Sequence, residues 1–195
     1  MFTTTNIPSP LSRLLHLLPC LLLTATAFAQ PPAAEAVIKD IRSQYTEAME
    51  KAQRQLTDDN QTEPSYTTST LHYMRPGCGT TTETLYFFYE LEEGKEPGEY
   101  RNSLYLCTRR FNVAPRQFYE EYLFDPQTQE PLFVYLRYET YEGENAVAEE
   151  RYYFHDGQIV WKIINQYGDS ANEGLIQGTC SALLSAFTYL VNHNY

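Results

Sequence analysis

The chain from Tyr66 to Ile164 is a succession of short runs rich in Tyr, Phe, Thr, Val and Leu, separated by Gly, Pro and Asp. β-Branched and aromatic residues suit a pleated sheet, whereas Gly, Pro and Asp mark turns. We predict strands over residues 67–75, 81–91, 101–112, 117–125, 132–140, 148–155 and 158–164. The connections between them are too short to hold a crossover helix, so neighbouring strands should pair antiparallel in a meander.

The stretch YYFHDGQIVWKII contains a histidine beside an aspartate, which could be half of a catalytic site or the bend of a hairpin. We favour the bend, because Asp-Gly suits a type I′ turn in which both residues have positive φ. This turn would put His155 opposite Gln158, Tyr153 opposite Val160 and Tyr152 opposite Trp161. One face should then be apolar (Tyr152, Phe154, Ile159, Trp161, Ile163) and the other mostly polar (Arg151, Tyr153, His155, Gln158, Lys162).

The hairpin from Tyr152 to Lys162 resembles single units of the bacterial repeats of the MORN or YwqK type. The shared features are a tyrosine pair, a glycine turn and an apolar return strand. A second, looser strand-turn-strand segment is FYEEYLFDPQTQEPLFVYLRY. The resemblance covers only about a tenth of the chain, and two copies are too few for a repeat array.

Two amphipathic helices are predicted, one on each side of the strands. Residues 34–56 carry apolar side chains at helical spacing: Val37, Ile38, Ile41, Tyr45, Ala48, Met49, Ala52 and Leu56. Near the C-terminus the same spacing joins Cys180, Leu183, Leu184, Phe187, Leu190 and Val191, and because Gly174 and Gly178 disfavour helix, we expect this one to begin near Thr179. The predicted fold class is α+β, an antiparallel β-meander of about seven strands with both helices packed on one face.

The first residues have the pattern of a cleaved secretory signal: Arg13, an apolar run from Leu14 to Leu23, and the small-residue site Ala27-Phe28-Ala29. The run is too short to span a bilayer, so we expect cleavage after Ala29 and no transmembrane segment. Residues 1–29 would be the signal peptide, and residues 30–195 a single domain. Removing the signal leaves 13 basic and 25 acidic residues, a net charge of −12, which disfavours nucleic acid as a partner.

Taken in order, the signal peptide, the IRSQYTEAMEKAQ helix, the Tyr-rich strands with RQFYEEYLFDP and the terminal helix resemble small, uncharacterised exported proteins of Gram-negative bacteria. The resemblance implies export to the periplasm or cell surface and an α+β fold. It supplies no catalytic residues.

Candidate chemistry is sparse. Cys78 with His72 nearby in sequence is the best nucleophile-base pair, but no signature of a known cysteine enzyme surrounds it. Glu120 and Glu121 are adjacent on a strand, so they should point to opposite faces and cannot easily act on one bond. No CxxC or HExxH spacing occurs, and we predict no catalytic, metal or cofactor-binding residues and no cofactor.

Three cysteines follow the signal, in a compartment that favours disulfides. Cys180 lies on the apolar face of the C-terminal helix, so we expect a buried free thiol there. A bond between Cys78 and Cys107 is the less favoured alternative, because the two do not face each other across a regular hairpin.

Tyrosine is the most abundant aromatic residue, with 17 copies, all after the signal. Tyrosines suit recognition surfaces, but they also fill sheets while their hydroxyls reach water, and this second interpretation is expected for Tyr86, Tyr89, Tyr122, Tyr135 and Tyr152. The leading hypothesis is an exported, non-catalytic module that presents a Tyr-rich sheet face to a protein, peptide or glycan. The alternatives are an envelope hydrolase with a site near His72 and Cys78, or a structural envelope component, for which Asp169-Ser170-Ala171 resembles a short O-glycosylation acceptor.

Overall fold

The computed structural model describes residues 32–57, 66–93, 98–140, 146–168 and 173–192. The predicted signal peptide, its cleavage site and Ser170 lie outside these residues.

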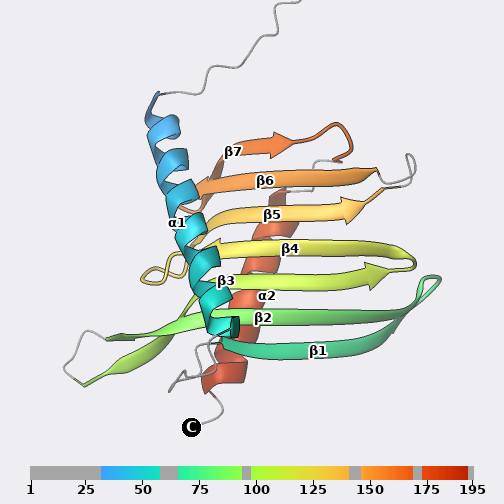
Figure 1. Ribbon diagram of the computed structural model, residues 1–195, viewed down its shortest axis with the longest axis horizontal. Coiled ribbons are helices and arrows are strands. Elements are labelled where there is room, and N and C mark those ends of the chain that lie inside the picture. The colour runs from blue at the N-terminus through green and yellow to red at the C-terminus, as the bar shows by residue number, and fades with distance from the viewer. Residues whose placement is uncertain (1–31, 58–65, 94–97, 141–145, 169–172, 193–195) are drawn as a thin grey trace, which may run out of the picture.

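Seven strands form one antiparallel sheet in which the spatial order follows the chain order (Figure 1). The predicted meander is therefore confirmed, and each predicted strand boundary lies within two residues of the observed one. The strands are β1 (Tyr66–Arg75), β2 (Gly79–Glu93), β3 (Tyr100–Val113), β4 (Arg116–Phe124), β5 (Pro131–Glu139), β6 (Val147–His155) and β7 (Gln158–Ile164).

The helices α1 (Pro32–Thr57) and α2 (Glu173–Asn192) lie on opposite faces of the sheet (Figure 1). Phe87 belongs to the core beneath α2, where its ring lies 6.1 Å from that of Phe187. Phe88, the next residue, belongs to the core beneath α1. The prediction that both helices pack on one face is wrong, because near-continuous apolar runs in the strands bury side chains on both faces.

The β6–β7 hairpin has the predicted turn. Asp156 and Gly157 adopt φ values of 50° and 70°, as a type I′ turn requires, and His155 pairs with Gln158. The exposed His155 ring lies 3.7 Å from the Asp156 carboxylate. Nothing in this geometry indicates more than a turn.

Further from the turn, the predicted pairing of this hairpin is wrong. The register shifts between Tyr153 and Phe154, so that Tyr153 pairs with Trp161, and Tyr152 pairs with Lys162. A β-bulge inserts one residue and moves the following side chains to the other face. Trp161 therefore packs beneath α1, and Tyr153, predicted on a mostly polar face, is only 3 % exposed.

Helix α2 begins at Glu173, not near Thr179 as predicted. Ile176, in the first turns of α2, is buried in the core between this helix and the sheet. This packing offsets the low helix propensity of Gly174 and Gly178. Glu173 lies in the first turn, where its charge suits the helix dipole, and its carboxylate accepts a hydrogen bond from Lys162 at 3.3 Å.

Among the described helices, α2 alone is long and apolar enough to cross a membrane by length and composition. A core helix can meet the same criterion. The apolar stripe of α2 packs on the sheet through Ile176, Cys180, Leu183, Phe187 and Val191.

Candidate functional site

The sheet face beneath α2 holds its polar side chains in internal pairs. Glu120 and Tyr122 on β4, and Glu150 and Tyr152 on β6, have the same Glu-x-Tyr spacing, which places both members of a pair on one face. The Tyr122 hydroxyl donates to Glu120 at 2.6 Å, and the Tyr152 hydroxyl donates to Glu150. These two phenols are buried, so the expectation that they reach water is wrong for Tyr122 and Tyr152.

The charges on this face are also paired. The Arg109 guanidinium donates to Glu83 at 2.8 Å and to Glu120 at 3.0 Å. Burial alone would raise the pKa of Glu83, but the hydrogen bond and charge of Arg109 outweigh it and hold that pKa below its usual value. Burial and the Glu120 carboxylate raise the pKa of the Tyr122 phenol. The charged groups and the two buried phenols of this face are therefore paired with one another.

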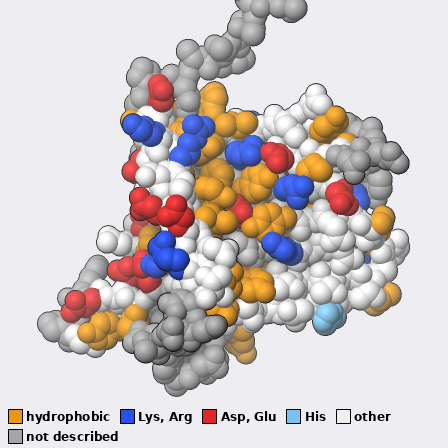
Figure 2. Space-filling view, viewed as in Figure 1, with side chains coloured by type: hydrophobic (Ala, Val, Ile, Leu, Met, Phe, Trp, Pro, Cys, Tyr) orange, Lys and Arg blue, Asp and Glu red, His pale blue; other side chains and the backbone are white. Residues whose placement is uncertain are grey.

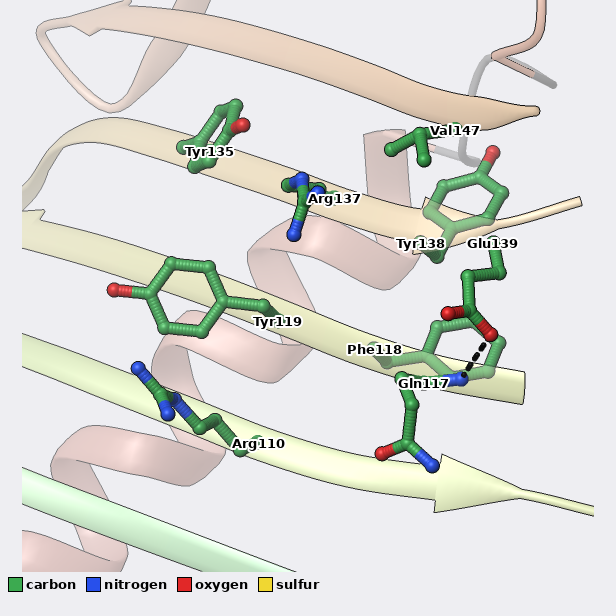
Figure 3. Close-up of a pocket in the computed structure, with 9 residues that line it drawn as sticks. All are labelled: Arg110, Gln117, Phe118, Tyr119, Tyr135, Arg137, Tyr138, Glu139 and Val147. Atoms are coloured by element: carbon green, nitrogen blue, oxygen red, sulfur yellow. Dashed lines mark hydrogen bonds between the residues drawn. The ribbon is translucent and has the colours of Figure 1, made fainter. Parts of the chain in front are cut away.

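The opposite face is only partly covered, because α1 crosses the strands at one end. Beside α1 the sheet forms a hollow of about 510 Å³, bounded by side chains of β3, β4, β5 and β6 (Figure 3). It is lined by Arg110, Gln117, Phe118, Tyr119, Tyr135, Arg137, Tyr138, Glu139 and Val147. A second hollow, of about 460 Å³, shares Arg110 and Tyr119 and reaches Met49, Ala52 and Leu56 of α1. We call the two together the Arg-Tyr groove.

Strand register explains how these residues meet. Arg110 pairs with Tyr119, and Tyr119 pairs with Arg137, so the three form one row across neighbouring strands. Directly paired residues of antiparallel strands point to the same face. Because strands are about 4.8 Å apart, the backbones that carry the two arginines are separated by about 10 Å. Tyr119 lies between them.

The two arginines of this row are exposed, and among the described residues neither forms an ion pair, although Arg137 pairs across the strands with Glu149. The Arg110 guanidinium lies 5.0 Å from the centre of the Tyr119 ring, a cation–π contact that holds the side chain over the sheet. Figure 2 shows basic side chains gathered beside α1 among hydrophobic ones, on a chain whose net charge is −11.

A neighbouring row supports the tyrosines. The Tyr135 hydroxyl donates to Glu149 at 3.0 Å, and Arg151 lies over the Tyr135 ring at 5.1 Å. Burial and the Glu149 carboxylate raise the pKa of Tyr135 to about 12, so its phenol keeps its proton at neutral pH. On the other side, Glu121 accepts hydrogen bonds from Tyr45 of α1 and from Tyr119, the latter at 2.5 Å. Hydrogen bonds to Glu149 and Glu121 thus fix the Tyr135 and Tyr119 rings in place.

Glu120 and Glu121 point to opposite faces, as predicted: one pairs with Arg109 beneath α2, and the other with Tyr45 beneath α1. The His72 ring is hydrogen-bonded to the Thr82 hydroxyl at 3.0 Å, and the Cys78 amide donates to Arg75 in the β1–β2 turn. Both residues are described, and no hydrogen bond joins the His72 ring to Cys78, so the candidate nucleophile-base pair gains no support.

The three described cysteines are free thiols. Cys180 is buried, as predicted, and its burial raises the pKa of the thiol to about 12. Cys107 is also buried, and burial raises the pKa of its thiol. Cys78 and Cys107 are not joined, so the less favoured alternative, a Cys78–Cys107 disulfide, does not form in this structure. Within the described ranges, no group of His, Cys, Asp and Glu side chains could hold a metal ion.

Comparison with protein-family models, with curated proteins and with solved structures finds no match for this chain. The sequence analysis named Tyr135 only among the tyrosines expected to fill the sheet, and it missed Arg110, Arg137 and Tyr119. The predicted strands contain all four, and only the register across β3, β4 and β5 shows that they share one face.

Proposed function

We propose that the protein is a non-catalytic recognition module whose Arg-Tyr groove binds a carboxylate-bearing protein, peptide or glycan. The observation that carries this proposal is the row of Arg110, Tyr119 and Arg137, in which two exposed arginines that form no ion pair with a described residue flank an aromatic ring. A guanidinium presents a planar fork of donors that matches a carboxylate, and a tyrosine offers a rigid ring with a polar tip.

The surrounding charge distribution supports selectivity for anions at this one place. The chain as a whole is acidic and repels acidic ligands, so a local basic groove concentrates their binding there. The strands that floor the groove are interior strands whose backbone groups already form the sheet. A ligand lying on them is therefore recognised by side chains, and not by strand addition.

The test is a binding screen with poly-L-glutamate and with a panel of acidic and neutral glycans, followed by titration of any hit. The double variant Arg110→Gln/Arg137→Gln should weaken binding at least tenfold, while Lys39→Gln/Arg54→Gln, which removes the same charge from exposed positions of α1, should change it little. Equal loss of affinity in both double variants would mean that binding depends on net charge alone, and would contradict the proposed groove. Absence of any saturable ligand would contradict the proposal.

We also propose that the protein acts outside the cytoplasm, in the periplasm or at the cell surface. The support is the basic residue, apolar run and Ala-x-Ala site at the N-terminus. N-terminal sequencing of the protein recovered from fractionated cells should give a chain that begins at Gln30. A chain that retains Met1 in the cytoplasmic fraction would contradict export.

A further inference from the structure

The two edges of the sheet differ in how well they are protected against pairing with another strand. At one edge, β7 has seven residues, carries an exposed Lys162 and is joined to β6 through a register shift. Short length, lysine and bulges are devices by which natural sheets block edge-to-edge association.

The other edge, β1, has none of these devices. It has ten residues, YTTSTLHYMR, and pairs with β2 from Tyr66 to Arg75 without a register shift. It contains no proline, lysine or acidic residue, and its one strongly basic residue, Arg75, lies at its end. Of the described strands only β2 pairs with β1, so the outer edge presents a long, regular row of backbone donors and acceptors.

We propose that β1 pairs antiparallel with β1 of a second copy of this chain. A twofold axis through the edge brings the same strand to itself in the antiparallel direction, which makes a self-complementary interface. Thr67 to Thr70, in the first half of β1, are uncharged, and the strand contains no acidic residue, so two copies meet here without repulsion between carboxylates despite the acidity of the whole chain. Facing Thr and Ser hydroxyls can hydrogen-bond across such a pair.

The exposed apolar side chains of β1 also favour this partner. Leu71 is 47 % exposed and Met74 is 72 % exposed, and they lie on opposite faces of the strand, since Leu71 pairs with Glu83, and Met74 with Thr80. A strand added at this edge covers part of each. An isolated monomer leaves both in water.

The geometry fixes how the two copies are oriented. In an antiparallel pair, residues that face each other point to the same side of the sheet. The α1 side of one copy therefore continues into the α1 side of its partner, and both Arg-Tyr grooves open on the same face of a doubled sheet. This pairing involves no groove residue, so it stands independently of the proposed ligand.

Sedimentation velocity over a dilution series of the protein tests this pairing. The parent protein should show a reversible monomer–dimer equilibrium. Thr70→Lys and Thr68→Lys, which place a charge on the exposed middle of the edge, should raise the dissociation constant at least tenfold, whereas Ser181→Lys on the exposed side of α2 should leave it unchanged. A protein that is monomeric at every concentration overturns the proposal, and so does a dimer that Thr70→Lys does not weaken.

A second measurement does not depend on introducing a charge. With Cys78 replaced by serine, a nitroxide label is attached to Thr70→Cys or, as a control, to Gln158→Cys at the opposite edge. Pairing through β1 brings the two labels at position 70 into strong dipolar contact and leaves those at position 158 far apart. The reverse pattern, or no coupling at either site, assigns any dimer to another surface.

Discussion

Arg109 and Arg110 are consecutive residues of β3, and the sheet uses them in opposite ways. Arg109 points beneath α2, where Glu83 and Glu120 both accept its hydrogen bonds. Arg110 points to the other face, where it is exposed beside Tyr119 and outside any ion pair formed by the described residues. Alternation along a strand thus separates a face that stabilises the fold from a face that can bind a ligand.

The largest expected difference between the two faces is in the free energy of unfolding, when a core residue beneath α2 is truncated. Phe87 is fully buried against Phe187, so Phe87→Ala should lower the free energy of unfolding by about 3–5 kcal/mol. Tyr86→Ala, on the half-open α1 face, should have a smaller effect, about 1–2 kcal/mol, because Tyr86 is only partly buried. Urea denaturation followed by the fluorescence of Trp161 measures both. A larger loss for Tyr86→Ala would show that the α1 face is the better packed one.

The next largest difference is expected between the stability losses caused by replacing Arg109 and Arg110 with alanine. Arg109→Ala leaves two largely buried carboxylates without their cation, and should cost about 2–4 kcal/mol. Arg110→Ala removes an exposed side chain that forms no ion pair with a described residue, and should change stability by no more than about 0.5 kcal/mol. Both variants lose one positive charge, so the comparison controls for net charge. Similar losses would mean that Arg110 has a structural role that its exposure does not indicate.

Most of the fold could be predicted from sequence because local signals and global topology agree. Short aromatic runs, turn residues and brief connections leave a meander as the simplest arrangement, and the strand boundaries follow from the turn positions. The side of the sheet that each helix covers could not be predicted in this way. Near-continuous runs such as Leu85 to Tyr89 have no polar face to orient them, and only packing shows that Phe87 faces α2 and Phe88 faces α1.

The site was less predictable than the fold, for reasons of register. The bulge at Tyr153 moved Trp161 to the face opposite the predicted one, since a one-residue slip reverses every later side chain. The Arg-Tyr groove depends in the same way on three strands being in register. In its own stretch of sequence, each arginine is indistinguishable from an ordinary surface residue. No single stretch therefore identifies it as part of a site.

In the β6–β7 turn, substitution should cause a moderate loss of stability at Gly157 but not at His155. Gly157 has φ 70°, a conformation strained for a β-branched residue, so Gly157→Val should cost about 1–3 kcal/mol. His155→Ala, at an exposed residue one position before the turn, should cost no more than about 0.5 kcal/mol. Trp161 lies in this hairpin and reports on both variants in urea. If His155→Ala is the more damaging change, His155 has a role that the turn geometry does not explain.

The smallest effect that still separates the two faces is the acid dependence of stability. Glu83 beneath α2 and Glu149 on the α1 face both have pKa values below the ordinary value of 4.5. For Glu83, burial raises the pKa but the hydrogen bond and charge of Arg109 outweigh it; for Glu149, the hydrogen bond from Tyr135 is the main cause. A carboxyl whose pKa is lower in the folded state contributes stability above its unfolded pKa, and loses it as the pH falls through the folded value.

Urea denaturation at a series of pH values below about 6 therefore gives a slope that each glutamate helps to set. Glu83→Gln should flatten that slope more than Glu149→Gln, because Glu83 is largely buried with its partner, while water screens the more exposed Glu149. Both variants remove one negative charge, so general repulsion changes equally in the two. If Glu149→Gln flattened the slope more, the α1 face would be coupled to folding through its charges, and the division between a stabilising face and a binding face would not hold.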